Sequence, residues 1–367
     1  MRQRRKLKDS LVIVCEGTDT EFLYFSDIAK VVQSEQPERF GIIRVVPTPV
    51  EVLEMEAARK ACKKKLLPGA TGKSHPEWLY YVEEDHSQAE YDKNKALPAR
   101  FVREAQLFLE DGEFTEAWAI YDKDIHPGHK RALELANMDS RLHIAYSAYS
   151  FEEWILCHFE RNSHPYYDSI CEEGICGVNN AGCMGHDCLI GRIRQKGYIR
   201  DFKKNMSGLY AKHLAQRMPQ AMINVAWLRF VGRVHEKELD IKLYQRNPYT
   251  TIDTLMRYLM SVSEQYEWHS LNEYFDFEKE QILMNIEGAD LIIKLKGNGT
   301  HPLRDERLFY CDGCGKRTAS LIPNSICLYG GRTEIRLKVD KKEKFIRFEE
   351  PKSIQYKVVL IELPFFS

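Results

Sequence analysis

The chain has 367 residues, of which 44% are hydrophobic and 29% are charged, and these proportions are typical of a globular protein with a sizeable core. At this length we expect two domains, or one large domain with a smaller appendage. The formal net charge of −1 provides no overall attraction for nucleic acid, so binding to such a partner would depend on local basic patches.

The sequence also indicates where in the cell the protein is located. No apolar run approaches the roughly 18 to 20 residues that a membrane-spanning helix needs. Residues 1–8 are basic, but the apolar run behind them reaches Glu16 too soon for a signal peptide. Ten cysteines would suit a disulfide framework in a small secreted chain, whereas in this longer chain thiols or metal ligands are the better interpretation. We therefore expect a cytoplasmic protein without a membrane partner.

The first half of the chain alternates between strand-like and helix-like patterns. Short apolar runs predict strands over 11–15, 42–46, 117–121 and 142–146. Helical spacing of apolar residues predicts helices over 18–32, 50–65, 99–109, 129–137 and 151–159. Strands that alternate with helices imply a parallel sheet with right-handed crossovers.

The second half departs from this rhythm. A cysteine- and glycine-rich stretch covers 165–190, and helical patterns resume over about 205–230 and 250–265. From about residue 270 the chain becomes rich in short β-like runs. We therefore predict an α/β domain over 10–265 that contains the cysteine-rich insert, followed by a β-rich extension over 270–367.

Carboxylates follow two of the predicted strands at the point where each strand ends. Glu16 comes directly after the first strand, and Asp122 and Asp124 follow the strand over 117–121. Open α/β folds place their chemistry at this edge of the sheet. Phosphoryl transfer needs a hard cation, and Mg²⁺ usually takes one or two carboxylates and keeps several waters. The pair of signals favours a divalent-metal site, and the alternative is that these acids only cap the helices that follow.

Four separated motifs, in this order, carry a resemblance to a known family. They are VCEGTDTE over 14–21 with YF at 24–25, DKD over 122–124, FEEW over 151–154 with HF at 158–159, and NPYTT over 247–251. Over roughly residues 10–260 the chain resembles the RloB-like branch of Toprim-fold proteins. Other Toprim proteins include topoisomerases, primases and overcoming-lysogenisation-defect nucleases.

The resemblance implies a fold and a set of site residues. The fold would be a Toprim-like α/β domain with a mostly parallel sheet flanked by helices. Glu16 would be the general acid or base, and Asp122 and Asp124 would bind Mg²⁺ or Mn²⁺. Glu21 and Glu152 would be ligands of a second ion. For Glu21 the alternative is an acid that interacts with the dipole of its own helix.

Other residues near these motifs have plainer interpretations. Glu153, next to Glu152, is expected to be a solvated helix residue, and His158 a packed, hydrogen-bonded histidine. Cys15 and Cys157 lie inside apolar runs, so we expect both to be buried.

The resemblance also implies a function. RloB-like Toprim proteins are associated with bacterial restriction and phage-defence loci, often beside an ATPase. It therefore implies a metal-dependent nuclease that acts on DNA, tRNA or another RNA, with an ATPase as a partner protein. A non-catalytic sensor or scaffold that binds nucleic acid or the ATPase is the alternative, and a primase- or topoisomerase-like activity ranks below both. The chain allows a homo-oligomer.

The cysteine-rich insert contains candidate zinc ligands. They are Cys171, Cys176, Cys183, His186 and Cys188, with glycines between them that allow tight turns. Zn²⁺ in structural sites takes four Cys or His ligands. We predict structural zinc here, with redox-labile thiols as the alternative. Cys311 and Cys314 form a C-x2-C pair that would need further ligands, such as His301 or Cys327, and free thiols are its alternative.

A basic segment with interleaved aromatic residues follows the insert. Its candidate substrate-binding residues are Arg192, Arg194, Lys196, Tyr198, Arg200, Lys203 and Lys204. The cations could contact phosphates while Tyr198 and Phe202 stack on a base. A solvated charged face is the alternative interpretation. Lys123, between the two aspartates, is expected to point away from their metal towards phosphate or solvent.

Overall fold

The structure is a computed structural model. It describes residues 8–47, 98–123, 128–166, 168–169, 188–239, 246–262, 264–277, 280–296, 301–303, 308–313, 315–322, 326–328, 334–350 and 356–364. The predicted helix over 50–65, Asp124 and most of the insert over 165–190 lie outside these ranges. The chain divides into two compact units, which we describe separately. The first comprises Met1–Phe159, Ser163–Arg217 and Ile241–Met260, and the second Glu160–Asn162, Met218–Asp240 and Ser261–Ser367.

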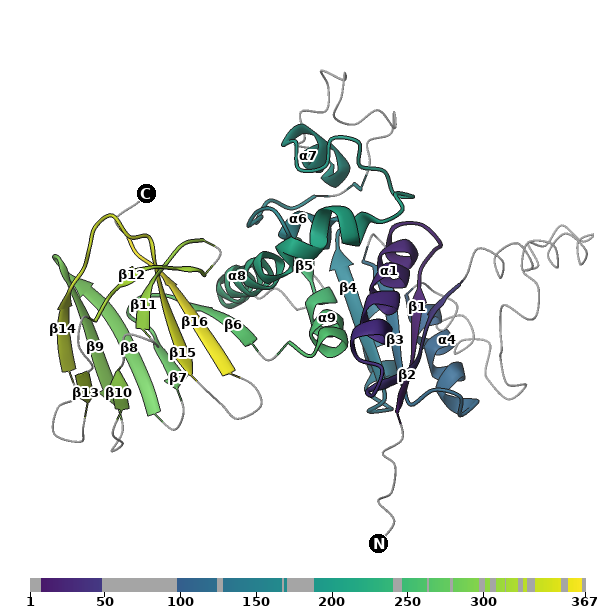
Figure 1. Ribbon diagram of the computed structural model, residues 1–367, viewed down its shortest axis with the longest axis horizontal. Coiled ribbons are helices and arrows are strands. Elements are labelled where there is room, and N and C mark those ends of the chain that lie inside the picture. Colours follow the sequence, from purple (N-terminus) through teal and green to yellow (C-terminus); the bar gives the residue numbers. More distant parts are fainter. Residues whose placement is uncertain are drawn as a thin grey trace, which may run out of the picture. The chain divides into compact units, whose positions relative to one another are not determined.

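A five-stranded sheet forms the centre of the first unit (Figure 1). Its strands are β1 (Asp9–Cys15), β2 (Phe40–Val46), β3 (Glu116–Asp122), β4 (Leu142–Ala148) and β5 (Tyr249–Thr250). They lie in the order β2-β1-β3-β4-β5, in which the first four are parallel and β5 is antiparallel to β4. The predicted α/β class with a mostly parallel sheet is therefore confirmed.

Helices flank this sheet. They are α1 (Thr20–Glu35), α4 (Ala99–Glu110), α5 (His129–Ala136), α6 (Glu152–Cys157) and α9 (Ile252–Met260), and α7 (Leu189–Gln195) packs against α6. Helices α4 and α5 pack on one face, against a cluster that includes Val12, Val14 and Ala119. The alternate residues Ile13 and Ile120 are equally buried, because β1 and β2 contact α1, and β4 contacts α9. Burial on both faces explains why these strands are continuous apolar runs in the sequence.

Two predicted helices differ from the structure. The pattern over 205–230 resolves into a π-helical turn (Tyr210–Leu214), a 3-10 turn (Ala215–Arg217) and α8 (Met218–Leu239). The helix predicted over 250–265 ends at Met260, because Ser261 adopts a positive φ of 54° that terminates a helix. Strand β6 (Glu264–His269) follows, so strand structure begins before residue 270.

The second unit is rich in β-structure, as predicted for the C-terminal region. One sheet has the order β12-β11-β15-β16-β6 and the other β14-β9-β8-β7. Their further strands are β7 (Tyr274–Phe277), β8 (Glu280–Glu287), β9 (Asp290–Lys296), β11 (Leu308–Cys311), β12 (Arg317–Ser320), β14 (Glu334–Lys338), β15 (Phe345–Glu350) and β16 (Tyr356–Glu362). Strands β10 (His301–Leu303) and β13 (Ile326–Leu328) form a separate pair.

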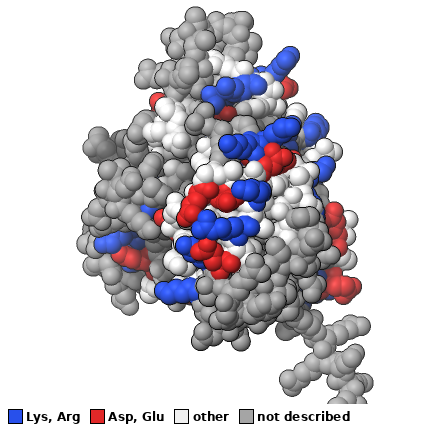
Figure 2. All heavy atoms as spheres, turned by 90° about the vertical axis from the view of Figure 1, so that its left-hand side faces the viewer, with Lys and Arg blue, Asp and Glu red and all other residues white. Residues whose placement is uncertain are grey.

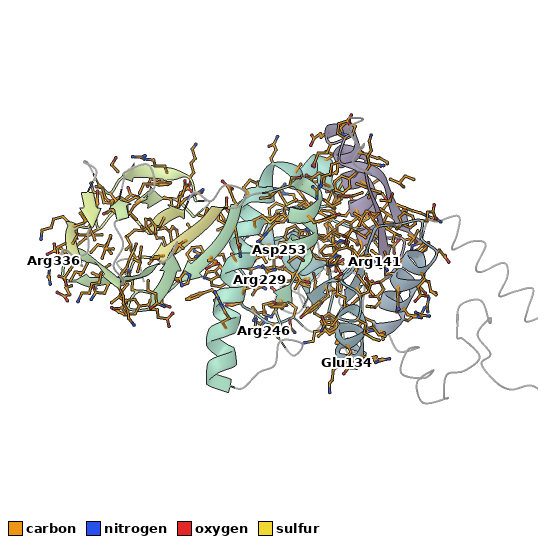
Figure 3. All side chains as sticks on the ribbon, turned by 90° about the horizontal axis from the view of Figure 1, so that it is seen from below. Glu134, Arg141, Arg229, Arg246, Asp253 and Arg336 are labelled. Atoms are coloured by element: carbon orange, nitrogen blue, oxygen red, sulfur yellow. The ribbon has the colours of Figure 1, made fainter. Side chains whose placement is uncertain are left out.

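Side chains from both sheets build one apolar core in this unit (Figure 3). Met284 and Ile293 of one sheet belong to the same buried cluster as Phe348 and Ile361 of the other. Helix α8 contacts β6, so a helix that precedes the β-rich sequence belongs to this unit. Among the described helices, none combines the length and the apolar character needed to cross a lipid bilayer.

Charged side chains of both signs are interleaved on the surface of the second unit (Figure 2). Across the four-stranded sheet, Lys294 pairs with Glu334 at 3.4 Å and Lys338 with Asp290 at 2.6 Å. Exposed pairs of this kind contribute little to stability, about 0–1 kcal/mol each. Because the signs alternate, these pairs do not form the single-sign basic surface that a nucleic-acid backbone would require.

Two glycines of the second unit allow a test of its backbone geometry. Gly288 and Gly315 have φ of +65° and +72°, a region that penalises residues with a Cβ atom. A Cβ at Gly315 would lie 3.0 Å from Arg347 Nη1 and 3.1 Å from Ile223 Cδ1, whereas one at Gly288 meets no described atom within 4 Å.

We predict that Gly288→Ala lowers the free energy of unfolding by about 1 kcal/mol, because it adds backbone strain alone. Gly315→Ala should cost roughly twice as much or more, since strain and a steric clash combine there. Urea unfolding of the full chain measures both variants. Equal losses at the two positions would contradict the packing described around Gly315.

Candidate active site

Three neighbouring parallel strands bring carboxylates to one edge of the sheet. Glu16 directly follows β1, Asp122 is the last residue of β3, and Glu152 begins α6 shortly after β4. The chain runs from β1 through α1 to β2 on one side, and β3 lies on the other side of β1. The strand order therefore reverses between β1 and β3, and α/β folds bind ligands in the crevice at such a switch point.

Hydrogen bonds hold the first two carboxylates in place. The backbone N–H of Asp122 donates to Glu16 Oε2 at 3.0 Å. Asp122 Oδ1 in turn accepts from the backbone N–H of Phe151 at 2.8 Å. The ends of β1 and β3 and the start of α6 are thus joined through the side chains of two predicted site residues.

Glu152 is buried and surrounded by donors. Its side chain is 1% exposed. Its Oε2 accepts from Ser150 Oγ at 2.6 Å and from Ser169 Oγ at 2.9 Å. Its Oε1 lies 3.5 Å from Thr20 Oγ1 and 3.9 Å from Lys204 Nζ. Two hydroxyl donors and an ammonium group therefore surround the buried carboxyl group of Glu152.

Glu21 and Asp122 interact electrostatically with the other acids. Glu21, in the first turn of α1, is only 9% exposed, and burial, followed by repulsion from Glu152, raises its pKa to about 7. Burial and the carboxylates of Glu21 and Glu152 raise the pKa of Asp122 well above its usual range. Glu16 adds to both shifts, whereas Lys204 opposes them. We call Glu16, Glu21, Asp122 and Glu152 the carboxylate cluster.

An aromatic cluster beneath these acids fixes α1 against α6. Trp154 Nε1 donates to Tyr24 Oη at 2.9 Å. The Tyr24 ring lies edge-on to Phe151 and Tyr210, with ring centroids 5.3 and 5.5 Å away. Because Glu21 and Glu152 lie in the first turns of these two helices, the packing sets the separation of their carboxylates.

Four residues near the family-like motifs were predicted to have structural rather than functional roles. Glu153 is 0% exposed, so the prediction of a solvated residue is wrong, and the reason is that every residue of α6 is buried. His158 packs as predicted: its Nδ1 lies 3.0 Å from the carbonyl of Trp154, and burial lowers its pKa to about 4. Cys15 and Cys157 are buried as expected.

The residues of the cluster fit a magnesium or manganese ion by their chemistry. All of them offer the hard oxygen ligands that these ions prefer. In the part of the chain that the structure describes, no three His, Cys, Asp or Glu side chains are close enough together to hold an ion. Mg²⁺ usually takes only one or two protein carboxylates and completes its shell with water and phosphate. Asp122 and Asp124 could supply these, although Asp124 lies outside the described residues.

Most of the predicted zinc ligands lie outside the residues that the structure describes. Cys171, Cys176, Cys183, His186 and Cys314 are not among the described residues. Cys188 is buried at the start of α7, where its Sγ accepts from the backbone N–H of Gly191 at 3.2 Å. Cys311 is buried in β11, and burial raises its pKa to about 12, so it is a protonated thiol in this arrangement. Structural zinc stays a prediction.

The basic segment after the insert is partly structural. Phe202 is fully buried, so the prediction that it stacks on a base is wrong. Tyr198 stacks on Phe159 with ring centroids 4.8 Å apart, and Arg194 Nε donates to the carbonyl of Phe202 at 2.8 Å. The remaining cations divide by exposure: Arg192 is half-buried, whereas Lys196, Arg200 and Lys203 are exposed.

Two lysines near the cluster face protein atoms. Lys204 is half-buried and lies beside Glu152. Lys123 Nζ donates to the carbonyl of Arg246 at 3.1 Å, and burial lowers its pKa to about 8. Lys123 is therefore directed at the backbone, where phosphate or solvent was expected.

Sequence reasoning missed the polar groups that surround Glu152. Thr20 lies inside the first family-like motif and Ser150 directly precedes the third, so their positions were a usable signal. The sequence carries no signal for the contacts of Ser169 and Lys204 with Glu152. Both contacts depend on how the residues after α6 fold in three dimensions.

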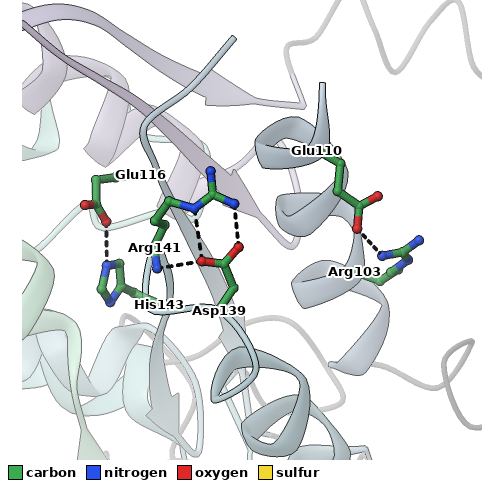
Figure 4. Close-up of polar contacts among 6 residues, drawn as sticks. All are labelled: Arg103, Glu110, Glu116, Asp139, Arg141 and His143. Carbon is green, nitrogen blue, oxygen red and sulfur yellow. Dashed lines mark hydrogen bonds and ion pairs between the residues drawn. The ribbon is translucent and has the colours of Figure 1, made fainter. Parts of the chain in front are cut away.

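A second polar group lies at the opposite end of the strands (Figure 4). Glu116 begins β3, and its Oε2 lies 2.7 Å from His143 Nε2. Asp139 and Arg141 pair at 2.6 Å just before β4. These side chains are partly exposed and belong to the amino ends of the strands, so they provide control positions away from the carboxylate cluster.

Glu21 allows a test of the electrostatic cost of the cluster. Its pKa in the folded protein is raised from 4.5 to about 7. Folding therefore becomes less favourable as the pH rises from the ordinary pKa of a glutamate to about 7. Glu21→Gln removes the titrating group. We predict that the variant is more stable than the wild type near pH 8, on the order of 2 kcal/mol, and gains much less near pH 5. Denaturant unfolding without divalent ions measures this, and a gain independent of pH would refute the raised pKa of Glu21.

His158 should change the stability with pH in the opposite direction. Because its folded pKa is lowered to about 4, the unfolded chain takes up a proton near its ordinary pKa while the folded protein does not. Stability should therefore fall as the pH drops from about 7 to 5, and His158→Gln should lose about 2 kcal/mol less over this interval. Unfolding at the two pH values tests the difference. Parallel pH profiles for wild type and variant would show that His158 is not buried in its neutral form.

Comparison with known proteins places the chain in a family. A family model described as RloB-like protein matches residues 11–259. This range is more than half of the chain, and it includes Glu16, Asp122 and Glu152. No curated protein matches the sequence, and no solved structure does either. The chain therefore belongs to the RloB-like family.

Proposed function

We propose that this protein is a metal-dependent nuclease that hydrolyses phosphodiester bonds in DNA or in RNA, including tRNA, through a Toprim-like α/β domain. The convergence of Glu16, Asp122 and Glu152 at the carboxyl edge of the parallel sheet is the observation that supports it most directly. The family match over these residues and the resemblance to Toprim proteins add support, and they also favour a role in anti-phage defence.

Asp122 and Asp124 would hold the ion, and Glu21 and Glu152 would serve a second one. A bound Mg²⁺ or Mn²⁺ would polarise the phosphate and stabilise the leaving oxygen. Glu16 would transfer the proton, because its carboxylate is oriented by the backbone N–H of Asp122 at 3.0 Å. Burial and the neighbouring carboxylates raise the pKa values of Glu21 and Asp122, and a bound cation would oppose both shifts.

Substrate contacts would come from the basic segment after the insert. Lys196, Arg200 and Lys203 are exposed and could pair with phosphates, while Lys204 lies beside the carboxylate cluster. An ATPase partner fits the family association. A cytoplasmic location fits this activity, and the described cysteines Cys15, Cys157, Cys188 and Cys311 form no disulfide bond.

The second candidate function is a non-catalytic sensor or scaffold that binds nucleic acid or an ATPase. One observation favours it: within the described ranges, no three potential ligands come together as an ion site. Salt-dependent binding of nucleic acid without cleavage in Mg²⁺ or Mn²⁺ would support this function over the nuclease.

Cleavage assays on the full chain test the nuclease. Labelled DNA and tRNA are incubated with and without Mn²⁺, beside Glu16→Gln and Asp122→Asn. We predict that each variant loses cleavage by about 100-fold or more and still folds, because each removes a group that acts on the reacting phosphate.

Matched controls carry the same chemical changes away from the cluster. Glu134→Gln alters a half-exposed glutamate on α5 (Figure 3), which pairs with Arg131 at 3.4 Å. Asp139→Asn alters the aspartate that pairs with Arg141 in Figure 4. Both should cleave at the wild-type rate. Wild-type activity in Glu16→Gln or Asp122→Asn would overturn the site assignment.

A further inference from the structure

Lys204 is held at the carboxylate cluster by its backbone as well as by its charge. Its carbonyl accepts a hydrogen bond from Thr20 Oγ1 at 2.9 Å. The same Thr20 hydroxyl lies 3.5 Å from Glu152 Oε1, and Lys204 Nζ lies 3.9 Å from that oxygen. The start of α1 therefore anchors the lysine where its ammonium group reaches the cluster.

The charge of Lys204 acts on more than one acid. It favours the ionised forms of both Glu21 and Asp122, against the repulsion from the other carboxylates. Four acids at one sheet edge repel one another, and a nearby cation reduces this repulsion. In electrostatic terms, the ammonium group does part of what a bound metal ion would do.

The neighbouring cations of the segment are placed differently. Lys203 is exposed, and Arg194 Nε donates to the carbonyl of Phe202 at 2.8 Å. Burial of Phe202 fixes the chain just before the two lysines, so adjacent side chains differ in their surroundings. Lys203 is therefore a natural control for Lys204, with the same charge one residue away.

The contact between Lys204 and Glu152 is suited to being exchanged. The lysine side chain is 41% exposed, and 3.9 Å is at the long end for an ion pair. A partly exposed pair of this kind is weak, whereas a divalent ion binds carboxylate oxygens directly. The flexible stem of a lysine lets the ammonium group leave one partner for another without moving the backbone.

We propose that Lys204 neutralises part of the carboxylate cluster in the metal-free protein. Its ammonium group pairs with Glu152 there and gives up this contact when Mg²⁺ or Mn²⁺ binds. The inference rests on the proposed function in so far as the cluster is taken to bind a divalent ion. The released ammonium group would then be available to a phosphate oxygen, because the Lys204 side chain is 41% exposed. Ion binding and substrate binding are then coupled through one side chain.

Mn²⁺ titration of the full chain without nucleic acid tests the proposal. Lys204→Gln, Lys203→Gln and Lys204→Arg are compared by calorimetry and by the unfolding temperature in EDTA and in Mn²⁺. Lys204→Gln should bind Mn²⁺ about fivefold more tightly than the wild type, because the competing cation is gone. It should also unfold at a lower temperature in EDTA, and Mn²⁺ should close that gap. Lys203→Gln and Lys204→Arg should resemble the wild type.

The other outcomes overturn the proposal in distinguishable ways. Equal Mn²⁺ affinity for Lys204→Gln and Lys203→Gln would show that Lys204 does not compete with the ion. A lower unfolding temperature both in EDTA and in Mn²⁺, with unchanged affinity, would make Lys204 a structural residue only. If the wild type binds no Mn²⁺, this inference and the metal site fail together. If it binds Mn²⁺ with the predicted differences but cleaves nothing, only the nuclease proposal fails.

Discussion

Burial of acidic side chains at one sheet edge, together with the repulsion among them, is the constraint on which the rest of the first unit depends. The acids come from segments far apart in the sequence, and burial raises the pKa of Glu21 and Asp122. Backbone N–H groups, hydroxyl groups and the ammonium group of Lys204 offset this cost. A globular protein gains no stability from such a cluster, and perturbed carboxylates of this kind are typical of functional sites.

The strand order of the sheet brings these acids together. Parallel neighbours β1, β3 and β4 end at the same edge, so residues just after them meet there. The hydrogen bond from Trp154 to Tyr24 then ties α6 to α1, which keeps Glu152 and Glu21 at a fixed separation. The aromatic residues of the family-like motifs therefore serve the acidic ones by positioning them.

Much of this could be predicted from the sequence, because parallel strands buried on both faces appear as apolar runs and the acids directly follow them. What could not be predicted depended on tertiary packing. Glu153 is buried because α6 is covered on every side, and Phe202 is in the core. Helix α8 belongs with the β-rich unit, although its own sequence gives no sign of that partner. The pairing of Lys204 with Glu152 joins residues whose proximity no local pattern records.

The central claim is that the acids of the carboxylate cluster bind divalent ions. Anomalous diffraction from crystals of the full chain grown with Mn²⁺ tests it most directly, since the signal locates the ion itself. We predict manganese peaks at the carboxyl edge of β1 and β3, one at Asp122 and a second at Glu21 and Glu152, and a Lys204 side chain turned away from Glu152. Manganese bound elsewhere in the crystal, with no peak at this edge and Lys204 still paired to Glu152, would contradict it.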